Sequence, residues 1–169
     1  KGTASSDCKH WAGSPEGAFD GDLSTKWVTC SGAAKVGKGI TYELNQPNAV
    51  TKVKTHQWGS ANNAIPKFDL YCSTDGATFT YVWTADLGDG VNTKEADSGM
   101  AAATAEEISG FTAPAPVCSS WQLQIAEDNP RGWEAHIFEI ELFNGDDLIS
   151  GPGKGTASSD CKHWAGSPE

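Results

Sequence analysis

Apolar and polar residues alternate along six stretches of the chain, as they do in β-strands that bury one face. The stretches cover residues 39–45, 49–58, 67–73, 80–87, 120–127 and 136–144. Turn-forming sequences separate them, among them NQPN after the first stretch and TDGAT after the third. Several short strands at this spacing predict an all-β domain, built as a sandwich or a barrel.

Signals for helices are weak. The best candidate is MAAATAEEI at residues 100–108, which is rich in alanine and glutamate. This stretch fits a short helix and a loop equally well. The predicted secondary structure is therefore almost entirely strand.

The same sixteen residues, KGTASSDCKHWAGSPE, occupy positions 1–16 and 154–169. The resulting repeat period of 153 residues has the size of a whole globular domain rather than of a solenoid unit. We therefore predict one domain over residues 1–145, a linker over 146–153, and the start of the next identical repeat at 154–169. The short linker ends in Gly-Pro-Gly and is expected to hold successive domains close together. The sequence does not decide whether the second copy docks on the next domain or completes its own domain by exchange. A further alternative is that it is a duplicated tag or a cloning remnant.

The chain is strongly acidic, with 12 Lys and Arg against 22 Asp and Glu and a formal net charge of −10. Nucleic acids and anionic membranes bind basic patches, so this charge disfavours both as partners. It suits a solvated extracellular surface or one that binds cations. No stretch approaches the roughly 18 apolar residues of a membrane-spanning helix.

Five cysteines reduce to four per repeat, because Cys161 is the second copy of Cys8. No two of them form a C-x-x-C pair, which disfavours a zinc or redox site. Four spaced cysteines favour two disulfides and an oxidising compartment. We predict the pairs Cys8–Cys30 and Cys72–Cys118. The sequence alone allows three pairings, and more if Cys161 competes with Cys8 for Cys30.

The sequence GAFDGDLSTKW at residues 17–27 carries the most informative chemistry. Asp20, Asp22 and Thr25 place acidic and hydroxyl oxygens in a tight loop that contains glycine. Ca²⁺ is bound by about six to eight oxygen ligands, so such a loop is a candidate for part of a calcium cage. The spacing is not that of an EF-hand. The alternative is that Asp20 and Asp22 only cap turns through local hydrogen bonds.

Seven sequence blocks, in this order and spacing, resemble the discoidin or coagulation factor 5/8 type C domain, a galactose-binding-like fold that family 32 carbohydrate-binding modules also use. The blocks are TASS at 3–6, AFDGDLSTKW at 18–27, ITYEL at 40–44, AVTKVKTH at 49–56, PKFDLYCSTDGATF at 66–79, WQLQI at 121–125 and GWEAHIFEIELFN at 132–144. The resemblance covers nearly the whole repeat. It implies an eight-stranded antiparallel jelly-roll β-sandwich in which both ends of the domain lie close together.

The resemblance also implies a structural calcium site that joins the first loop to the last strand. By position, Glu139 in the sequence FEIEL completes the ligand set begun by the three loop residues named above. Main-chain oxygens near Ala18 and Glu141 are expected to add to it. One ion would then tie the beginning of the domain to its end.

In the carbohydrate-binding members of this family, loops at one end of the sandwich hold the sugar, with an aromatic ring stacked on it and polar groups on its hydroxyls. The corresponding sequences here are HQWGSANN at 56–63 and EDNPRGW at 127–133, with CKHW at 8–11 in the N-terminal segment. The candidates are Trp58 and Trp133 for stacking and His56, Asn62, Asn129 and Arg131 for hydrogen bonding. The alternative is that these tryptophans pack inside the protein, as we expect of Trp27 and Trp121.

No catalytic function is expected, because the sequence has no nucleophile elbow, phosphate-binding loop or H-E-x-x-H pair. Insertion into membranes is not expected either, because the loops lack basic clusters. Two functions remain for a secreted or cell-surface protein. One is a structural filament in which neighbouring copies stack head to tail, and the other is a multivalent adhesin that binds glycans. Identical units give identical junctions, so the repeat favours the filament.

Overall fold

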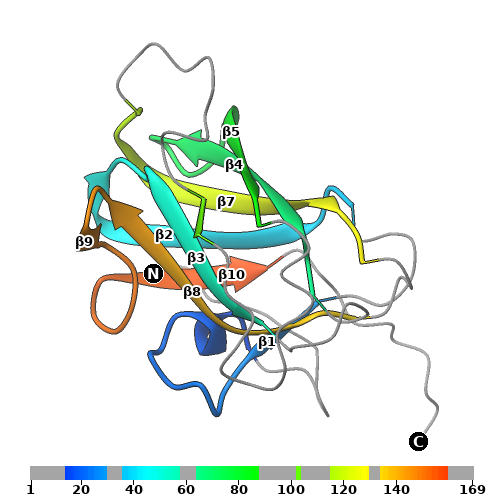
Figure 1. Cartoon of the computed structure of the whole chain (residues 1–169). Coiled ribbons are helices and arrows are strands. Elements are labelled where there is room, and N and C mark those ends of the chain that lie inside the picture. Colours follow the sequence, from blue (N-terminus) through cyan, green and yellow to red (C-terminus); the bar gives the residue numbers. More distant parts are fainter. Residues whose placement is uncertain are drawn as a thin grey trace, which may run out of the picture.

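The computed structural model describes residues 14–29, 36–57, 64–87, 102–103, 115–129 and 134–159. Within these ranges the chain forms a short 3-10 helix and ten strands, arranged in two layers (Figure 1). In chain order they are η1 (Pro15–Ala18), β1 (Trp27–Val28), β2 (Gly39–Asn48), β3 (Lys52–Gln57), β4 (Lys67–Ser73), β5 (Thr80–Asp86), β6 (Ala102–Ala103), β7 (Cys118–Glu127), β8 (His136–Asn144), β9 (Asp147–Leu148) and β10 (Gly155–Ser159).

Each layer is a five-stranded sheet. One has the order β1-β8-β3-β6, with β9 also paired to β8, and the other has the order β10-β2-β7-β4-β5. All of these strand pairs are antiparallel. The predicted antiparallel β-sandwich is therefore confirmed. In the part of the chain that the structure describes, no helix has both the length and the apolar character needed to cross a bilayer.

The six predicted strands correspond to β2, β3, β4, β5, β7 and β8. The bounds of β4 and β8 are as predicted, whereas β2 and β7 are longer and β3 is shorter. Strands β1, β6 and β9 have two residues each, which is too short for an alternating pattern to show. Because Ala102–Ala103 form β6, these two residues within the candidate helix 100–108 are strand.

The core lies between the two sheets, where alternate side chains of each long strand point inward. Its largest members include Trp27, Trp83, Trp121, Tyr42 and Phe68, all of them at most 2% exposed. The expectation that Trp27 and Trp121 are core residues is confirmed. Full burial of one such side chain stabilises the fold by about 1.5–3 kcal/mol.

The segment predicted to be a linker, residues 146–153, is packed against the sandwich in this structure. Strand β9 forms a hairpin with the end of β8, and Ser150 is 1% exposed. The Ser150 hydroxyl accepts a hydrogen bond from the backbone N–H of Leu142 at 2.9 Å. Strand β10, from the second copy of the repeated sequence, then adds to the edge of β2. Whether this segment also links the domain to a following repeat stays a prediction.

The predicted disulfide between Cys72 and Cys118 is confirmed. It joins the end of β4 to the start of β7 within one sheet, with the two Cα atoms 5.8 Å apart. The second predicted pair, Cys8–Cys30, and the competing Cys161 lie outside the described residues.

We expect removal of this disulfide by the double substitution Cys72→Ala and Cys118→Ala to lower the free energy of unfolding by about 4 kcal/mol, because the bond closes a loop of 46 residues in the unfolded chain. Urea denaturation of the variant and of the wild-type protein checks this value. An unchanged urea midpoint would show that the bond does not constrain the unfolded chain.

Candidate functional site

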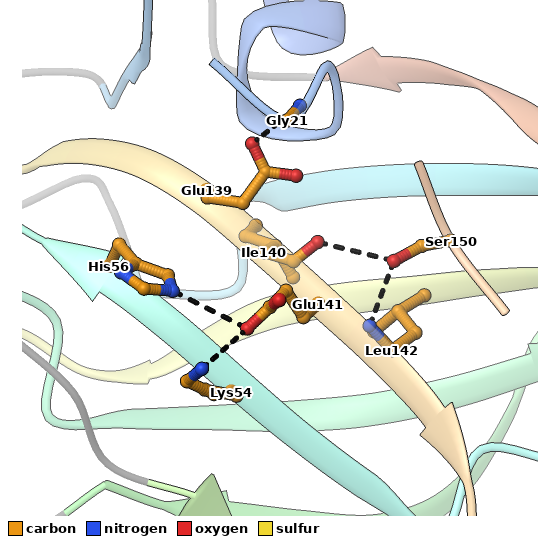
Figure 2. A network of polar contacts seen from close by, with 8 residues as sticks. All are labelled: Gly21, Lys54, His56, Glu139, Ile140, Glu141, Leu142 and Ser150. Atoms are coloured by element: carbon orange, nitrogen blue, oxygen red, sulfur yellow. Dashed lines mark hydrogen bonds and ion pairs between the residues drawn. The ribbon is translucent and has the colours of Figure 1, made fainter. Parts of the chain in front are cut away.

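The loop that follows η1 is fixed to β8 by one long-range hydrogen bond. The backbone N–H of Gly21 donates to Glu139 Oε2 at 3.1 Å, across 118 residues of sequence (Figure 2). Gly21 has a φ of +75°, a conformation that glycine adopts without strain. Glu139 lies on β8 under this loop and is only 7% exposed. The predicted proximity of the first loop to Glu139 is therefore present in the structure.

The hydroxyl of Thr25 is the centre of a cluster of oxygens in this loop. Its Oγ1 lies 2.6 Å from Asp20 Oδ2, 2.9 Å from the carbonyl oxygen of Asp22 and 3.2 Å from the carbonyl oxygen of Gly17. The other carboxylate oxygen of Asp20 accepts a hydrogen bond from the N–H of Asp22 at 2.9 Å. The loop thus gathers four oxygens of three chemical kinds within a few ångströms.

The structure shows how the side chains of Asp22 and Glu141 are oriented, while their roles as metal ligands stay predictions. The Asp22 carboxylate is exposed and accepts a hydrogen bond from the N–H of Ser24 at 2.8 Å, so this residue faces the cluster with its main-chain oxygen. Hydrogen bonds from Ser24 lower the pKa of Asp22. The side chain of Glu141 points to β3, where its Oε2 lies 3.0 Å from Lys54 Nζ and 3.3 Å from His56 Nε2 (Figure 2). Ala18 is fully buried beside the cluster, next to Gly17 in sequence.

Glu139 has an unusual protonation equilibrium. Burial raises the pKa of its carboxyl from the ordinary 4.5 to about 7, and the negative charges of Asp20 and Glu141 act in the same direction, against the hydrogen bond from Gly21. A carboxylate in such surroundings binds a proton or a cation more readily than one in water. Among the residues described, no three or more His, Cys, Asp and Glu side chains are grouped to hold a metal. A cation here would therefore depend on hydroxyl and carbonyl oxygens as well, which Ca²⁺ accepts as ligands.

The predicted sugar-binding loops begin and end at one end of the sandwich. Gln57, the last residue of β3, pairs with Ile137 near the start of β8, and Val28 of β1 pairs with His136. Residue 135, which precedes β8, is connected to the end of β7 by the second of these loops. The ends of β1, β3 and the start of β8 therefore meet where both loops are attached.

Buried polar groups that the sequence analysis missed hold the bases of both loops. The Gln57 side chain accepts a hydrogen bond from the N–H of Ile65 at 2.7 Å and donates to the carbonyl of Ile65 at 3.0 Å, which closes the base of the loop 58–63. The Thr29 hydroxyl accepts from the N–H of Ala135 at 2.8 Å, and the Thr29 N–H donates to the carbonyl of Ala135 at 2.9 Å. Gln57 and Thr29 are both at most 3% exposed. A polar residue at an inward position of β3 was the available signal for Gln57.

The structure places two of the six predicted sugar-binding residues. His56 lies on β3 with its Nε2 next to the carboxylate of Glu141, and its Nδ1 is buried without a hydrogen-bond partner among the described residues. Asn129 follows β7 and is 4% exposed. The other predicted residues, Trp58, Asn62, Arg131 and Trp133, lie outside the described residues.

Comparisons with known proteins agree with this architecture. The family model of the F5/8 type C domain matches residues 1–109. The fold is similar to CBM32-3 from a family 31 glycoside hydrolase of Clostridium perfringens, with 18% identity, a TM-score of 0.58 and coverage of 84% of this chain and 86% of the other. It is also similar to the family 32 module of Clostridium perfringens NanJ in complex with galactose, with 17% identity, a TM-score of 0.56 and coverage of 84% and 93%.

A third similar structure is the CBM32 of AlyQ in complex with 4,5-unsaturated mannuronic acid, with 22% identity, a TM-score of 0.51 and coverage of 77% and 85%. Among curated proteins, no significant match was found. The three structural likenesses establish the fold. The family match covers well over half of the chain and confirms the resemblance seen in the sequence.

The raised pKa of Glu139 predicts a pH dependence of stability in protein freed of metal by a chelator. The folded state binds this proton more tightly than the unfolded state, so the stabilisation is fully present below about pH 4.5 and is lost as the pH rises through about 7. The slope between these limits is at most about 1.4 kcal/mol per pH unit.

The substitution Glu139→Gln keeps the hydrogen-bond acceptor for Gly21 and removes the titration. Urea unfolding of both proteins between about pH 5 and about pH 7.5 covers most of this window, and it compares how steeply the free energy of unfolding changes with pH. We expect the wild-type protein to lose stability relative to the variant as the pH rises. Parallel profiles would show that Glu139 titrates normally.

Proposed function

The chain belongs to the F5/8 type C domain family, and we propose that it is a non-catalytic, extracellular carbohydrate-binding module stabilised by a calcium ion in its first loop. The observation that carries the proposal is the end of the sandwich at which β1, β3 and β8 meet. Two loops rich in tryptophan, asparagine and arginine are attached there, and buried polar groups hold the base of each. Structures with the same fold contain galactose or an unsaturated mannuronic acid.

A sugar site requires a flat apolar surface for the ring face and fixed polar groups for the hydroxyls. The two loops supply Trp58 and Trp133 as stacking surfaces and Asn62 and Arg131 as hydrogen-bonding groups. Gln57 and Thr29 restrain the ends of these loops, and restraint before binding lowers the entropy that a ligand must overcome. Specific binding of a neutral or acidic sugar is thus supported by residue type and by the rigidity of the scaffold.

His56 is supported as a further polar group of this site. Its Nε2 lies 3.3 Å from Glu141 Oε2, and the same carboxylate oxygen lies 3.0 Å from Lys54 Nζ (Figure 2). These contacts fix the orientation of the imidazole at the end of β3, next to the first loop of the proposed site. The side chain of Glu141 therefore has a positioning role for His56, and the prediction that a main-chain oxygen near Glu141 adds to the metal site is separate from it.

The calcium site is supported by an excess of acceptor oxygens over donors. The single hydroxyl proton of Thr25 faces three acceptors, namely Asp20 Oδ2 and the carbonyl oxygens of Gly17 and Asp22. One proton satisfies only one acceptor at a time. A hard cation satisfies all of them, and the nearby Glu139 supplies a second carboxylate. We propose Asp20, Thr25, the carbonyls of Gly17 and Asp22, and Glu139 as its ligands.

The repeated sequence supports a multivalent protein in which linked copies of a weakly binding module gain avidity. Stacking of neighbouring copies into a filament was the preferred prediction from the sequence, and it stays a prediction. The family match and the fold favour glycan binding over the filament as the primary function.

Separate substitutions Trp58→Ala and Trp133→Ala are expected to weaken glycan binding at least tenfold each, which is about 1.4 kcal/mol. A glycan array identifies the sugar, with galactose and unsaturated mannuronic acid as the first probes, and calorimetry then compares the variants. Tyr81→Ala is the control, because Tyr81 is an exposed aromatic on β5. This strand is an edge of the sheet that contains none of β1, β3 and β8. A wild-type protein that binds no glycan, or variants that bind like the control, would contradict the proposal.

Addition of Ca²⁺ at 100 times its dissociation constant is expected to stabilise the wild-type protein by about 2.7 kcal/mol. The double variant Asp20→Asn and Glu139→Gln should lose this gain, whereas Asp146→Asn, which removes a fully exposed carboxylate, should retain it. Thermal melting with and without a chelator measures the effect. A melting temperature of the wild-type protein that does not respond to Ca²⁺ would refute the ion site and leave the glycan proposal intact.

A further inference from the structure

The edge of β2 is covered by a strand that belongs to the second copy of the repeated sequence. Strand β10 pairs with β2 from Gly155 opposite Leu44 to Ser159 opposite Ile40. The N–H of Asn45 donates to the carbonyl of Lys154 at 2.8 Å, and the Ser159 hydroxyl donates to the carbonyl of Gly39 at 2.7 Å. Five residue pairs and two flanking hydrogen bonds thus satisfy backbone groups of β2 that would otherwise form an open edge. Figure 1 shows β10 as the outermost strand of its sheet.

The fit between β10 and β2 depends on sequence at two positions. A Cβ atom at Gly155 would overlap the carbonyl oxygen of Glu43 and would lie 2.6 Å from Cε1 of Tyr42, so only glycine fits there. Two residues later, Ala157 points into the core and is 4% exposed. The edge therefore selects a strand with glycine and a small apolar residue in this spacing.

The first copy of the repeated sequence meets every one of these requirements, because residues 1–6 are identical to residues 154–159. Gly2 corresponds to Gly155, Ala4 to Ala157 and Ser6 to Ser159. One strand edge pairs with only one partner strand. The chain consequently contains two identical donor segments for a single acceptor edge.

The first copy also has the reach to occupy this edge within its own chain. Residue Ser14 precedes η1, which packs against β10, and the ring of Phe19 lies 4.3 Å from the ring of Tyr42, the partner of Ala157. Ser6 is eight residues before Ser14. Eight extended residues span about 26 Å. Neighbouring strands lie only about 5 Å apart, so this length crosses several of them.

We propose that the edge of β2 is an acceptor site for the sequence Lys-Gly-Thr-Ala-Ser-Ser, and that residues 1–6 take the place of residues 154–159 within the same chain. Gly151 and Gly153 belong to neither copy and keep their contacts with β2 in both arrangements. The Tyr42 hydroxyl lies 3.0 Å from the N–H and from the carbonyl oxygen of Gly151, and Asn45 Nδ2 donates to the carbonyl of Gly153 at 2.6 Å.

The exchange has a consequence for linked repeats. A segment between two units carries one copy of this sequence, which completes either the unit before it or the unit after it. If a further repeat follows, the second copy in this chain is a strand of the preceding sandwich in one arrangement and would be the first strand of the following unit in the other. The connection between two units changes accordingly, without loss of the edge strand from either one.

Three variants of the full chain test the proposal: Gly155→Val, Gly2→Val and the double variant. Each substitution prevents one copy from pairing with β2. Because the other copy replaces it, each single variant should melt within about 1–2 °C of the wild-type protein, whereas the double variant should melt about 5 °C or more below it. The control is the double substitution Thr3→Val and Thr156→Val. It alters both copies at the position that Thr156 holds exposed in β10, so the melting temperature should be unchanged.

Thermal melting together with light scattering distinguishes the outcomes. Small effects of both single variants, a large effect of the double variant and a monomeric mass throughout would support exchange within one chain. The proposal is overturned if Gly155→Val melts as low as the double variant, because residues 1–6 then do not reach or fit the edge. It is also overturned if the double variant melts like the wild-type protein, or if Gly155→Val becomes dimeric, because a second chain then fills the edge.

Discussion

The burial of the Glu139 carboxylate beneath the first loop is the constraint on which the arrangement of this domain depends. The loop from Gly17 to Thr25 has no strand pairing of its own, and the hydrogen bond from Gly21 to Glu139 connects it to β8. Burial raises the pKa of this carboxyl to about 7, and the charges of Asp20 and Glu141 act in the same direction, so a bound proton or a bound cation would stabilise the site. The same loop leads directly into β1, whose two residues pair with β8. The charge at Glu139 is therefore expected to affect how firmly the loop around Gly21 is held.

Strand β8 connects this charge site to the proposed sugar-binding end. Its first residues pair with β1 and with the end of β3. Thr29 directly follows β1, and Gln57 is the last residue of β3. Both residues fix the base of a loop through paired hydrogen bonds to backbone groups. In the proposed function, a cation at Glu139 would stabilise the strands that carry the loops, and the loops would supply the groups that recognise a ligand.

The sequence predicted those features that a local pattern or the family resemblance records. Strands such as β4 and β8 alternate clearly because one face of each is buried, and the resemblance brought Asp20, Thr25 and Glu139 together across more than one hundred residues. The sequence did not show which oxygen of Asp22 faces the loop: its carboxylate accepts a hydrogen bond from the N–H of Ser24, and its main-chain carbonyl faces Thr25. The sequence left open whether residues 154–169 pair with their own domain, because the partner strand of β10, β2, is about 110 residues away and a glycine-rich approach to it resembles a linker. No local pattern contains such a pairing.

The central claim is that Glu139 is a buried carboxyl group whose ionisation depends on a cation, and carboxyl-carbon NMR measures this ionisation directly. In protein freed of metal by a chelator, the Glu139 resonance should titrate with a pKa of about 7. In protein saturated with Ca²⁺, the carboxylate should stay ionised well below that pH, because the cation favours the charged form. A Glu139 carboxyl that titrates near its ordinary value of 4.5 in the chelated protein, and in the same way with Ca²⁺, would contradict this account.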